Sequence, residues 1–173
     1  MHADTPYDDL TPDLILDALE ACGQRVDGRL LTLNSYENRV FQVGLDSGHM
    51  VVAKFYRPGR WSDEQILEEH AFALELAEAE VPAVPPMALT HLLPHAREGA
   101  RVIGEPPTLA HFRGHRIAVA HRRGGRPPEL EDPEVLRWIG RFLARLHTVG
   151  ARRPFVHRRT FSTAAGQASK QPV

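Results

Sequence analysis

The sequence contains one cysteine and no long apolar run. Cys22 has no second cysteine with which to form an internal disulfide, so nothing in the 173 residues indicates an oxidising compartment. No stretch approaches the roughly 18 consecutive apolar residues that a membrane-spanning helix needs. The N-terminus is acidic and has no apolar signal-peptide region. These absences predict a cytoplasmic protein that does not cross a membrane.

Acidic residues are missing from the C-terminal part of the sequence. The last one is Glu134, and the 39 residues after it contain eight Arg or Lys. The net charge of −1 nevertheless argues against a dedicated nucleic-acid binder. Arg122, Arg123 and Arg126 add to the basic character, but neither interleaved aromatic residues nor a recognition motif accompanies them. We therefore interpret the basic region as a solvated tail, or as a surface exposed by truncation, in preference to a surface that contacts nucleic acid or another anionic surface.

The first part of the sequence predicts a helix followed by a three-stranded antiparallel meander. A threonine, a proline and an aspartate at residues 11–13 are typical of a helix start, and Gly23 ends the apolar pattern. Short apolar runs of strand type follow, separated by turn-forming residues at 34–38 and 46–48. The runs are residues 30–33, 40–43 and 50–56.

A second helix is predicted over residues 62–80 from its capping-box pattern and helical spacing. Prolines between residues 81 and 86 then force an extended chain, and residues 87–115 give little indication of structure. A short apolar strand over residues 116–120, a polar link and a helix that begins at Asp132 complete the order. The apolar stripe of this last helix comprises Val135, Leu136, Ile139, Phe142, Leu143 and Leu146.

Lys54 stands in the middle of an apolar strand. An ammonium group that faces inward from such a strand needs an anionic partner, and Glu68 and Glu69 near the start of the following helix are candidates. In kinases, a lysine on the third strand holds the nucleotide phosphates and pairs with a helix glutamate. The alternative is a lysine on an edge strand that points to solvent. Spacing alone leaves both interpretations open.

Several motifs, in the same order, resemble those of bacterial serine/threonine kinases in the aminoglycoside-phosphotransferase-like group. They are residues 33–41 (LNSYENRVF), 52–58 (VAKFYRP), 65–70 (QILEEH) and 139–147 (IGRFLARLH). In that order they are similar to the nucleotide loop, the third strand, the helix after it and the helix that enters the large lobe. Glu69 aligns better than Glu68 with the helix motif of the group.

The resemblance implies an α+β fold: a protein-kinase-like small lobe, built from an antiparallel sheet plus helices, followed by the first helix of a truncated large lobe. It divides the chain into a nucleotide-binding small lobe at residues 1–121, a hinge link with the first large-lobe helix at 122–160, and a disordered tail at 161–173. The implied activity is phosphoryl transfer from ATP with Mg²⁺ to a serine or threonine hydroxyl of a protein substrate, linked to stress response. Neither nucleic acid nor a membrane is an implied partner.

The resemblance also assigns binding residues. Ser35 and Asn38 in the first turn would contact ATP. Lys54 would hold the phosphates of ATP, and Glu69 would orient Lys54. The first turn lacks the GxGxxG pattern of typical protein kinases, so its small polar side chains and backbone N–H groups would have to bind the phosphates. Residues 119–121 would form either the adenine-facing hinge or a neutral loop.

The catalytic residues of the group have no counterpart in this sequence. Phosphoryl transfer needs an Asp that positions the substrate hydroxyl and an Asp with an Asn that hold Mg²⁺, all beyond the helix that ends near His147. Because no Asp, Glu or Asn follows Glu134, we expect no kinase turnover from this polypeptide alone. The chain is then a fragment of an active kinase, a nucleotide- or partner-binding module without catalysis, or an unstable remnant.

Two histidine pairs have a spacing found in metal sites. They are His91 with His95 and His111 with His115. A proline or a glycine inside each pair makes a helical presentation unfavourable. We therefore interpret all four as incidental loop histidines, and no metal ligand is predicted.

Overall fold

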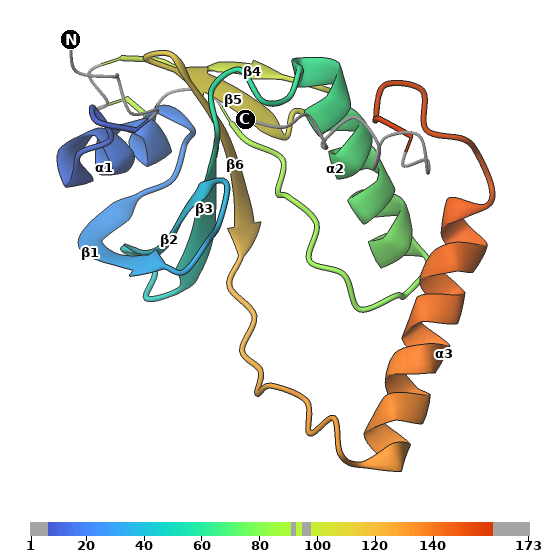
Figure 1. Ribbon diagram of the computed structural model, residues 1–173. Coiled ribbons are helices and arrows are strands. Elements are labelled where there is room, and N and C mark those ends of the chain that lie inside the picture. Colours follow the sequence, from blue (N-terminus) through green and yellow to red (C-terminus); the bar gives the residue numbers. More distant parts are fainter. Residues whose placement is uncertain (1–6, 91–92, 95–97, 161–173) are drawn as a thin grey trace, which may run out of the picture.

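The computed structural model describes residues 7–90, 93–94 and 98–160. Within these ranges a six-stranded antiparallel sheet lies between two helices, and a third helix projects away from it (Figure 1). This arrangement confirms the predicted α+β class. The predicted tail at 161–173 and the histidine pair His91 and His95 lie outside the described residues.

The strands of the sheet follow the order β1-β2-β3-β6-β5-β4 (Figure 1). They are β1 (Val26–Leu33), β2 (Arg39–Leu45), β3 (Met50–Tyr56), β4 (Arg101–Ile103), β5 (Leu109–Phe112) and β6 (His115–His121). The predicted meander is confirmed as β1 to β3, although β1 begins four residues earlier than expected. β4 and β5 lie in the stretch of residues 87–115, for which the sequence gave little indication of structure. Strands of three and four residues are too short to show an alternation of apolar and polar side chains.

Helix α1 (Pro12–Ala21) covers one face of the sheet and has the predicted cap. The Thr11 hydroxyl accepts a hydrogen bond from the Leu14 N–H at 3.2 Å, and a proline occupies the first turn. Cys22 follows directly and is fully buried, and burial raises the pKa of its thiol to about 12. This cysteine is therefore part of the core, since a thiol that stays protonated at neutral pH is not a nucleophile.

Helix α2 (Asp63–Glu78) covers the opposite face, and its predicted capping box is present. The Gln65 N–H donates to the Ser62 hydroxyl at 3.3 Å, and the Ser62 N–H donates to the Gln65 side-chain oxygen at 3.0 Å. After α2 the chain is extended through residues 81–86, as its prolines predict. It then joins the sheet, where the Met87 N–H donates to the Val119 carbonyl at 2.8 Å.

Alternation along β3 separates the core from the polar face that matters below. Successive strand residues point to opposite faces of a sheet. Val51, Ala53 and Phe55 are buried in the main core, which lies on the α1 side. Lys54 and Tyr56 therefore face α2, where Tyr56 packs in a second cluster.

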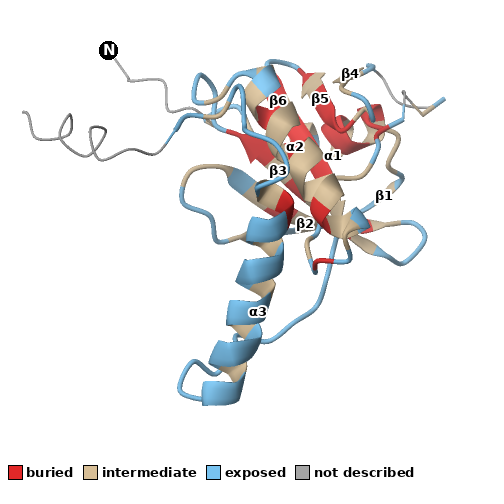
Figure 2. Ribbon diagram, turned by 90° about the vertical axis from the view of Figure 1, so that its right-hand side faces the viewer, coloured by how far each residue is buried: buried red, intermediate tan, exposed pale blue. Residues whose placement is uncertain are grey.

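Helix α3 (Pro133–Gly150) projects from the sheet and meets the rest of the chain near its C-terminal end (Figure 2). There Val149 packs with Leu76 of α2. The Arg145 guanidinium donates to the carbonyls of residues 79–80 at 3.0 and 2.8 Å. Those carbonyls lie at the end of α2, so the arginine satisfies acceptors that a helix end leaves unpaired.

The apolar stripe predicted for α3 is present and only partly covered, because four of its six residues are half-buried and two are exposed. Leu136 and Leu143 on the stripe are 51% and 50% exposed, and the neighbouring Trp138 is 60% exposed. An amphipathic helix normally turns such a stripe toward another element. Within the described part of the chain, α3 packs on the α2 cluster near Leu146 and Val149 and projects away from the sheet over the rest of its length (Figure 2).

We expect this stripe to make the chain self-associate, because contiguous exposed apolar surface promotes association. Replacing Leu136 and Leu143 together with lysine should shift the weight-average mass toward that of one chain, as measured by sedimentation equilibrium across a concentration series. Ala144→Lys is the matched control, since Ala144 is exposed on another side of the same helix. A wild-type chain that remains monomeric at all concentrations would contradict the expectation.

Candidate functional site

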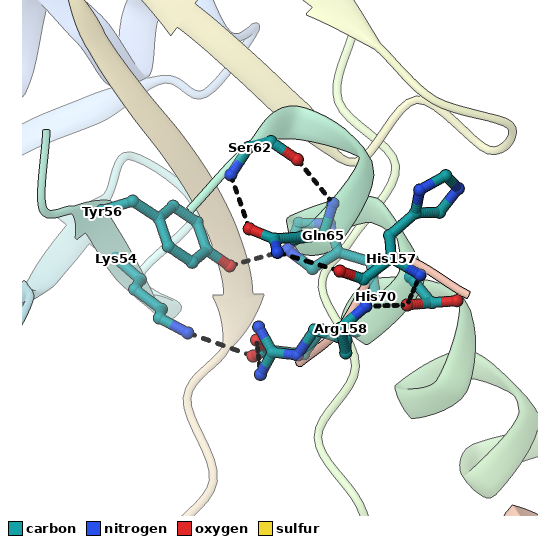
Figure 3. A network of polar contacts seen from close by, with 9 residues as sticks. Lys54, Tyr56, Ser62, Gln65, His70, His157 and Arg158 are labelled. Carbon is teal, nitrogen blue, oxygen red and sulfur yellow. Dashed lines mark hydrogen bonds and ion pairs between the residues drawn. The ribbon is translucent and has the colours of Figure 1, made fainter. Parts of the chain in front are cut away.

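Packing of α2 on the sheet brings Lys54 and Glu69 together. Figure 3 shows the Lys54 ammonium beside Tyr56 and directed toward Arg158. The Lys54 Nζ lies 3.2 Å from Oε1 of Glu69, and the two side chains are 31% and 37% exposed. The ammonium also lies 4.4 Å from the centre of the Tyr56 ring, a cation–π distance. β3 is flanked by β2 and β6, so the alternative of an edge-strand lysine is wrong.

A buried chain of hydrogen bonds fixes α2 beside this pair. His70, which follows Glu69, is 3% exposed. Its Nε2 lies 2.8 Å from the Tyr56 hydroxyl, and its Nδ1 lies 2.9 Å from the Thr108 hydroxyl. Burial lowers the pKa of His70 to about 4 and raises the pKa of Tyr56, so both are neutral at pH 7. Sequence reasoning missed these hydrogen bonds, because Tyr56 lies on β3, His70 on α2 and Thr108 in the loop before β5.

The N-terminus of α2 is tied to the sheet by Asp63. Its carboxylate accepts a hydrogen bond from Nε of Arg116 at 2.6 Å and lies 3.0 Å from Nε2 of His111. Burial by itself raises the pKa of Asp63, but the hydrogen bond and charge of Arg116 and the charge of His111 outweigh it, and the net pKa is lowered. Both ends of the segment that carries Glu69 are thus held on the sheet.

A pocket lies next to the ion pair, on the α2 side of the sheet. Lys54 and Glu69 are its charged lining residues, and most of the rest are apolar. The apolar members include Val40, Val52, Val84, Pro86, Val119 and Ala120. Apolar walls with a few polar groups are typical of sites for small molecules.

Residues 119–121 are the last residues of strand β6, so the alternative of a neutral loop is wrong. Val119 and Ala120 line the pocket that contains Lys54. Ala120 pairs with Val52 across the sheet, and the Val119 carbonyl accepts from Met87. The adenine contact that the resemblance implies for this segment stays a prediction.

Ser35 and Asn38 lie in the turn between β1 and β2, and their polar groups organise that turn. The Ser35 hydroxyl donates to the Asn38 carbonyl at 2.5 Å. The Asn38 side-chain oxygen accepts from the Arg57 N–H at 3.2 Å, which ties the turn to the loop after β3. The ATP contacts assigned to these two residues stay a prediction.

The two neighbouring glutamates of α2 have different partners. Glu69 faces Lys54, whereas Glu68 accepts backbone N–H groups from residues 156–158, which follow α3. The geometry therefore agrees with the choice of Glu69 over Glu68 as the partner of Lys54. Arg158 contacts the second carboxylate oxygen of Glu69, Oε2. The sequence did not indicate this contact, because the two residues are far apart in the chain.

The remaining predicted histidine pair is not in a loop. His111 lies in β5 and His115 begins β6, on the two sides of a tight turn. His111 contacts Asp63, and Nε2 of His115 lies 3.1 Å from Asp9. Among residues 7–90, 93–94 and 98–160 there is no group of three or more His, Cys, Asp or Glu side chains that could hold a metal ion. Nor does any helix of those ranges have the length and apolar character to cross a membrane.

Comparison with known proteins defines the fold and the family. A solved structure of the amicoumacin kinase hAmiN, in complex with AMP-PNP, Ca²⁺ and Ami, superposes with a TM-score of 0.64 at 17% identity, over 90% of this chain and 44% of that one. The chain therefore shares the α+β fold of this part of the kinase, with an antiparallel sheet and helices. Residues 30–170 match the model of the phosphotransferase enzyme family. The chain belongs to this family.

Two curated relatives are much more similar in sequence. Stress response kinase A of Escherichia coli (strain K12) is 42% identical over 154 residues, which cover 89% of this chain. Serine/threonine protein kinase RdoA of Salmonella typhimurium (strain LT2) is 41% identical over 152 residues, which cover 88% of it. The chain spans 42% of the length of each of these relatives.

Proposed function

We propose that the chain is the nucleotide-binding part of a serine/threonine protein kinase and that ATP binds in the pocket beside Lys54 and Glu69. The single observation that carries the proposal is the Lys54–Glu69 ion pair at an apolar pocket on a kinase-like sheet. The lysine would hold the phosphates, and the apolar walls would enclose the adenine ring. Ser35 and Asn38 would contact the nucleotide from the turn between β1 and β2.

The described residues fit the nucleotide better than they fit a metal. A cation beside apolar walls suits a triphosphate attached to an aromatic base. The same residues contain no cluster of ligands for Mg²⁺. In this proposal Mg²⁺ accompanies the phosphates of ATP and neutralises part of their charge, and no ligand for it is assigned to this chain.

The names of the relatives extend the proposal to the substrate and the setting. A stress response kinase and a serine/threonine protein kinase are 42% and 41% identical to this chain. We therefore include a protein hydroxyl as phosphoacceptor, a role in stress response, and a cytoplasmic location, where ATP is available. This polypeptide by itself should bind ATP without turnover, because its sequence offers no catalytic Asp after the last helix.

Calorimetric titration with AMP-PNP and Mg²⁺ should show binding to the wild-type chain and much weaker binding to Lys54→Met. Methionine keeps most of the length of the side chain and removes its charge. The loss should be roughly 10- to 100-fold in affinity, the size expected for one charge-assisted contact. Arg141→Met is the matched control, since Arg141 is an exposed cation on α3.

Lysine labelling provides a second measurement of the same contact. The sequence has two lysines, Lys54 and Lys170, so an amine reagent and mass spectrometry resolve each of them. AMP-PNP with Mg²⁺ should protect Lys54 from the reagent. Labelling of Lys170 is the internal control for the activity of the reagent. Equal affinities of wild type and Lys54→Met, together with unchanged labelling of Lys54, would exclude the phosphate role of this lysine.

A second candidate function is a partner-binding module without catalysis. The exposed apolar stripe on α3 favours it, because such a surface promotes association with another protein. The two functions are separable, since the stripe and the pocket lie on different elements.

A further inference from the structure

The segment after α3 turns and runs back along α2. Residues 154–158 of this segment are called the strap here. Phe155 of the strap packs edge-on against Phe72 of α2, with ring centres 5.3 Å apart. The side-chain amide of Gln65 donates to the His157 carbonyl at 2.9 Å (Figure 3). The strap is therefore held along the helix that carries Glu69.

Glu68 fixes the backbone of the strap. Its carboxylate accepts three successive N–H groups, from Val156 at 2.5 Å, His157 at 2.9 Å and Arg158 at 2.8 Å. Desolvation raises the pKa of Glu68, but these three bonds together outweigh it and the net pKa is lowered. Hydrogen bonds to a charged acceptor are stronger than neutral ones, so this contact determines where the Arg158 side chain begins.

Arg158 reaches the nucleotide pocket through Glu69. Its guanidinium lies 3.1 Å from Oε2 of Glu69 and 4.4 Å from the centre of the Trp61 ring. Oε1 of the same carboxylate faces Lys54 at 3.2 Å. Each oxygen of Glu69 therefore has its own cation, and the arginine itself is stacked on an aromatic ring.

A second cation changes what Glu69 does for Lys54. A glutamate at the surface has several rotamers, and holding one of them costs side-chain entropy. Arg158 offsets part of that entropy cost, because it restricts the rotamers of Glu69 before the nucleotide binds. The position of Arg158 is itself fixed by Glu68 and Trp61. When phosphate groups attract the Lys54 ammonium, a carboxylate that stays in place keeps the ammonium at the pocket.

We propose that Arg158 is a positioning residue for the nucleotide site. Arg158 orients Lys54 through Glu69, and Glu68 fixes the strap on which Arg158 lies. This inference rests on the proposed function and adds to it a group from outside the small-lobe sheet. It also gives Glu68 and Glu69 separate roles, one in placing the strap and one in placing the lysine.

A double-mutant cycle on AMP-PNP affinity, with Mg²⁺ present, tests the inference. Arg158→Gln should weaken binding roughly three- to tenfold in the wild-type background and should have no further effect in Glu69→Gln, because its action passes through that carboxylate. Arg158→Lys should recover part of the affinity. Arg159→Gln is the matched control, because it removes the same charge from the next, exposed position.

Hydrogen exchange tests the role of Glu68 without nucleotide. Glu68→Gln should speed exchange at the amides of residues 156–158 and weaken AMP-PNP binding as much as Arg158→Gln does. Glu78→Gln, at an exposed position of the same helix, should leave both unchanged.

The outcomes separate this inference from the proposed function. A wild-type chain that fails to bind AMP-PNP overturns both. If the wild type binds and Lys54→Met weakens binding, the proposed function stands. The positioning role is then wrong if Arg158→Gln binds like wild type or weakens binding equally with and without Glu69.

Discussion

Replacing Phe55 with alanine should destabilise the chain by about 3–5 kcal/mol, the usual cost of removing a large aromatic side chain from a core. Phe55 is fully buried on β3, in the middle of the sheet. Its ring packs edge-on against Phe41 at 5.7 Å and against His115 at 6.0 Å. Because domains of this size have a free energy of unfolding of roughly 5–15 kcal/mol, this loss approaches the whole stability of a marginal one.

Urea unfolding followed by circular dichroism would measure the loss for Phe55→Ala. Leu31→Ala is the control, since Leu31 is 56% exposed on the edge strand β1 and its truncation should cost less than about 0.5 kcal/mol. A Phe55→Ala variant within 1 kcal/mol of wild type would mean that the core of the sheet is packed differently. The variant also bears on function, since Phe55 lies between Lys54 and Tyr56 on the strand that presents the lysine.

Local signals in the sequence were sufficient for the helices and for the meander. The cap of α1 and the capping box of α2 each involve residues three positions apart, so the sequence displays them directly. β3 is marked by its apolar run, and the turns on each side of β2 by small polar residues. The order of these elements, with its resemblance to a kinase family, was enough to predict that Lys54 and a glutamate of the next helix would meet.

Features that depend on distant residues could not be predicted in this way. The Glu68 carboxylate binds N–H groups 88 to 90 positions further along the chain. The Thr108 hydroxyl that meets His70 comes from a stretch without a periodic pattern. Such contacts depend on the completed packing of α2 against the sheet and of the strap against α2. Spacing alone left Glu68 and Glu69 open, and the resemblance to the kinase family favoured Glu69. The three-dimensional arrangement adds what the sequence could not show, the separate partners of Glu68 in residues 156–158.

His70 should make the chain lose stability as the pH falls from about 6.5 toward 4. Burial lowers the pKa of His70 from 6.5 to about 4, a shift that the nearby charge of Lys54 reinforces and that of Glu69 opposes. Between these two values the unfolded chain binds a proton that the folded chain excludes, so the free energy of unfolding decreases with decreasing pH. The loss should reach about 2 kcal/mol at pH 5 and about 3 kcal/mol below pH 4, and no loss is expected above about pH 7.

Urea midpoints at pH 7.5 and pH 5 would measure this effect. The interval lies above the range in which the carboxylates Asp63 and Glu68 titrate, because their pKa values are lowered from the ordinary carboxylate values. His70→Gln should flatten the dependence, whereas His147→Gln, at an exposed position of α3, should retain it. A wild-type chain that is equally stable at both pH values would show that protonation of His70 does not lower the free energy of unfolding. Because His70 holds α2 against Tyr56, we expect the same acid range to loosen the contact between Glu69 and Lys54, so nucleotide affinity should fall with stability.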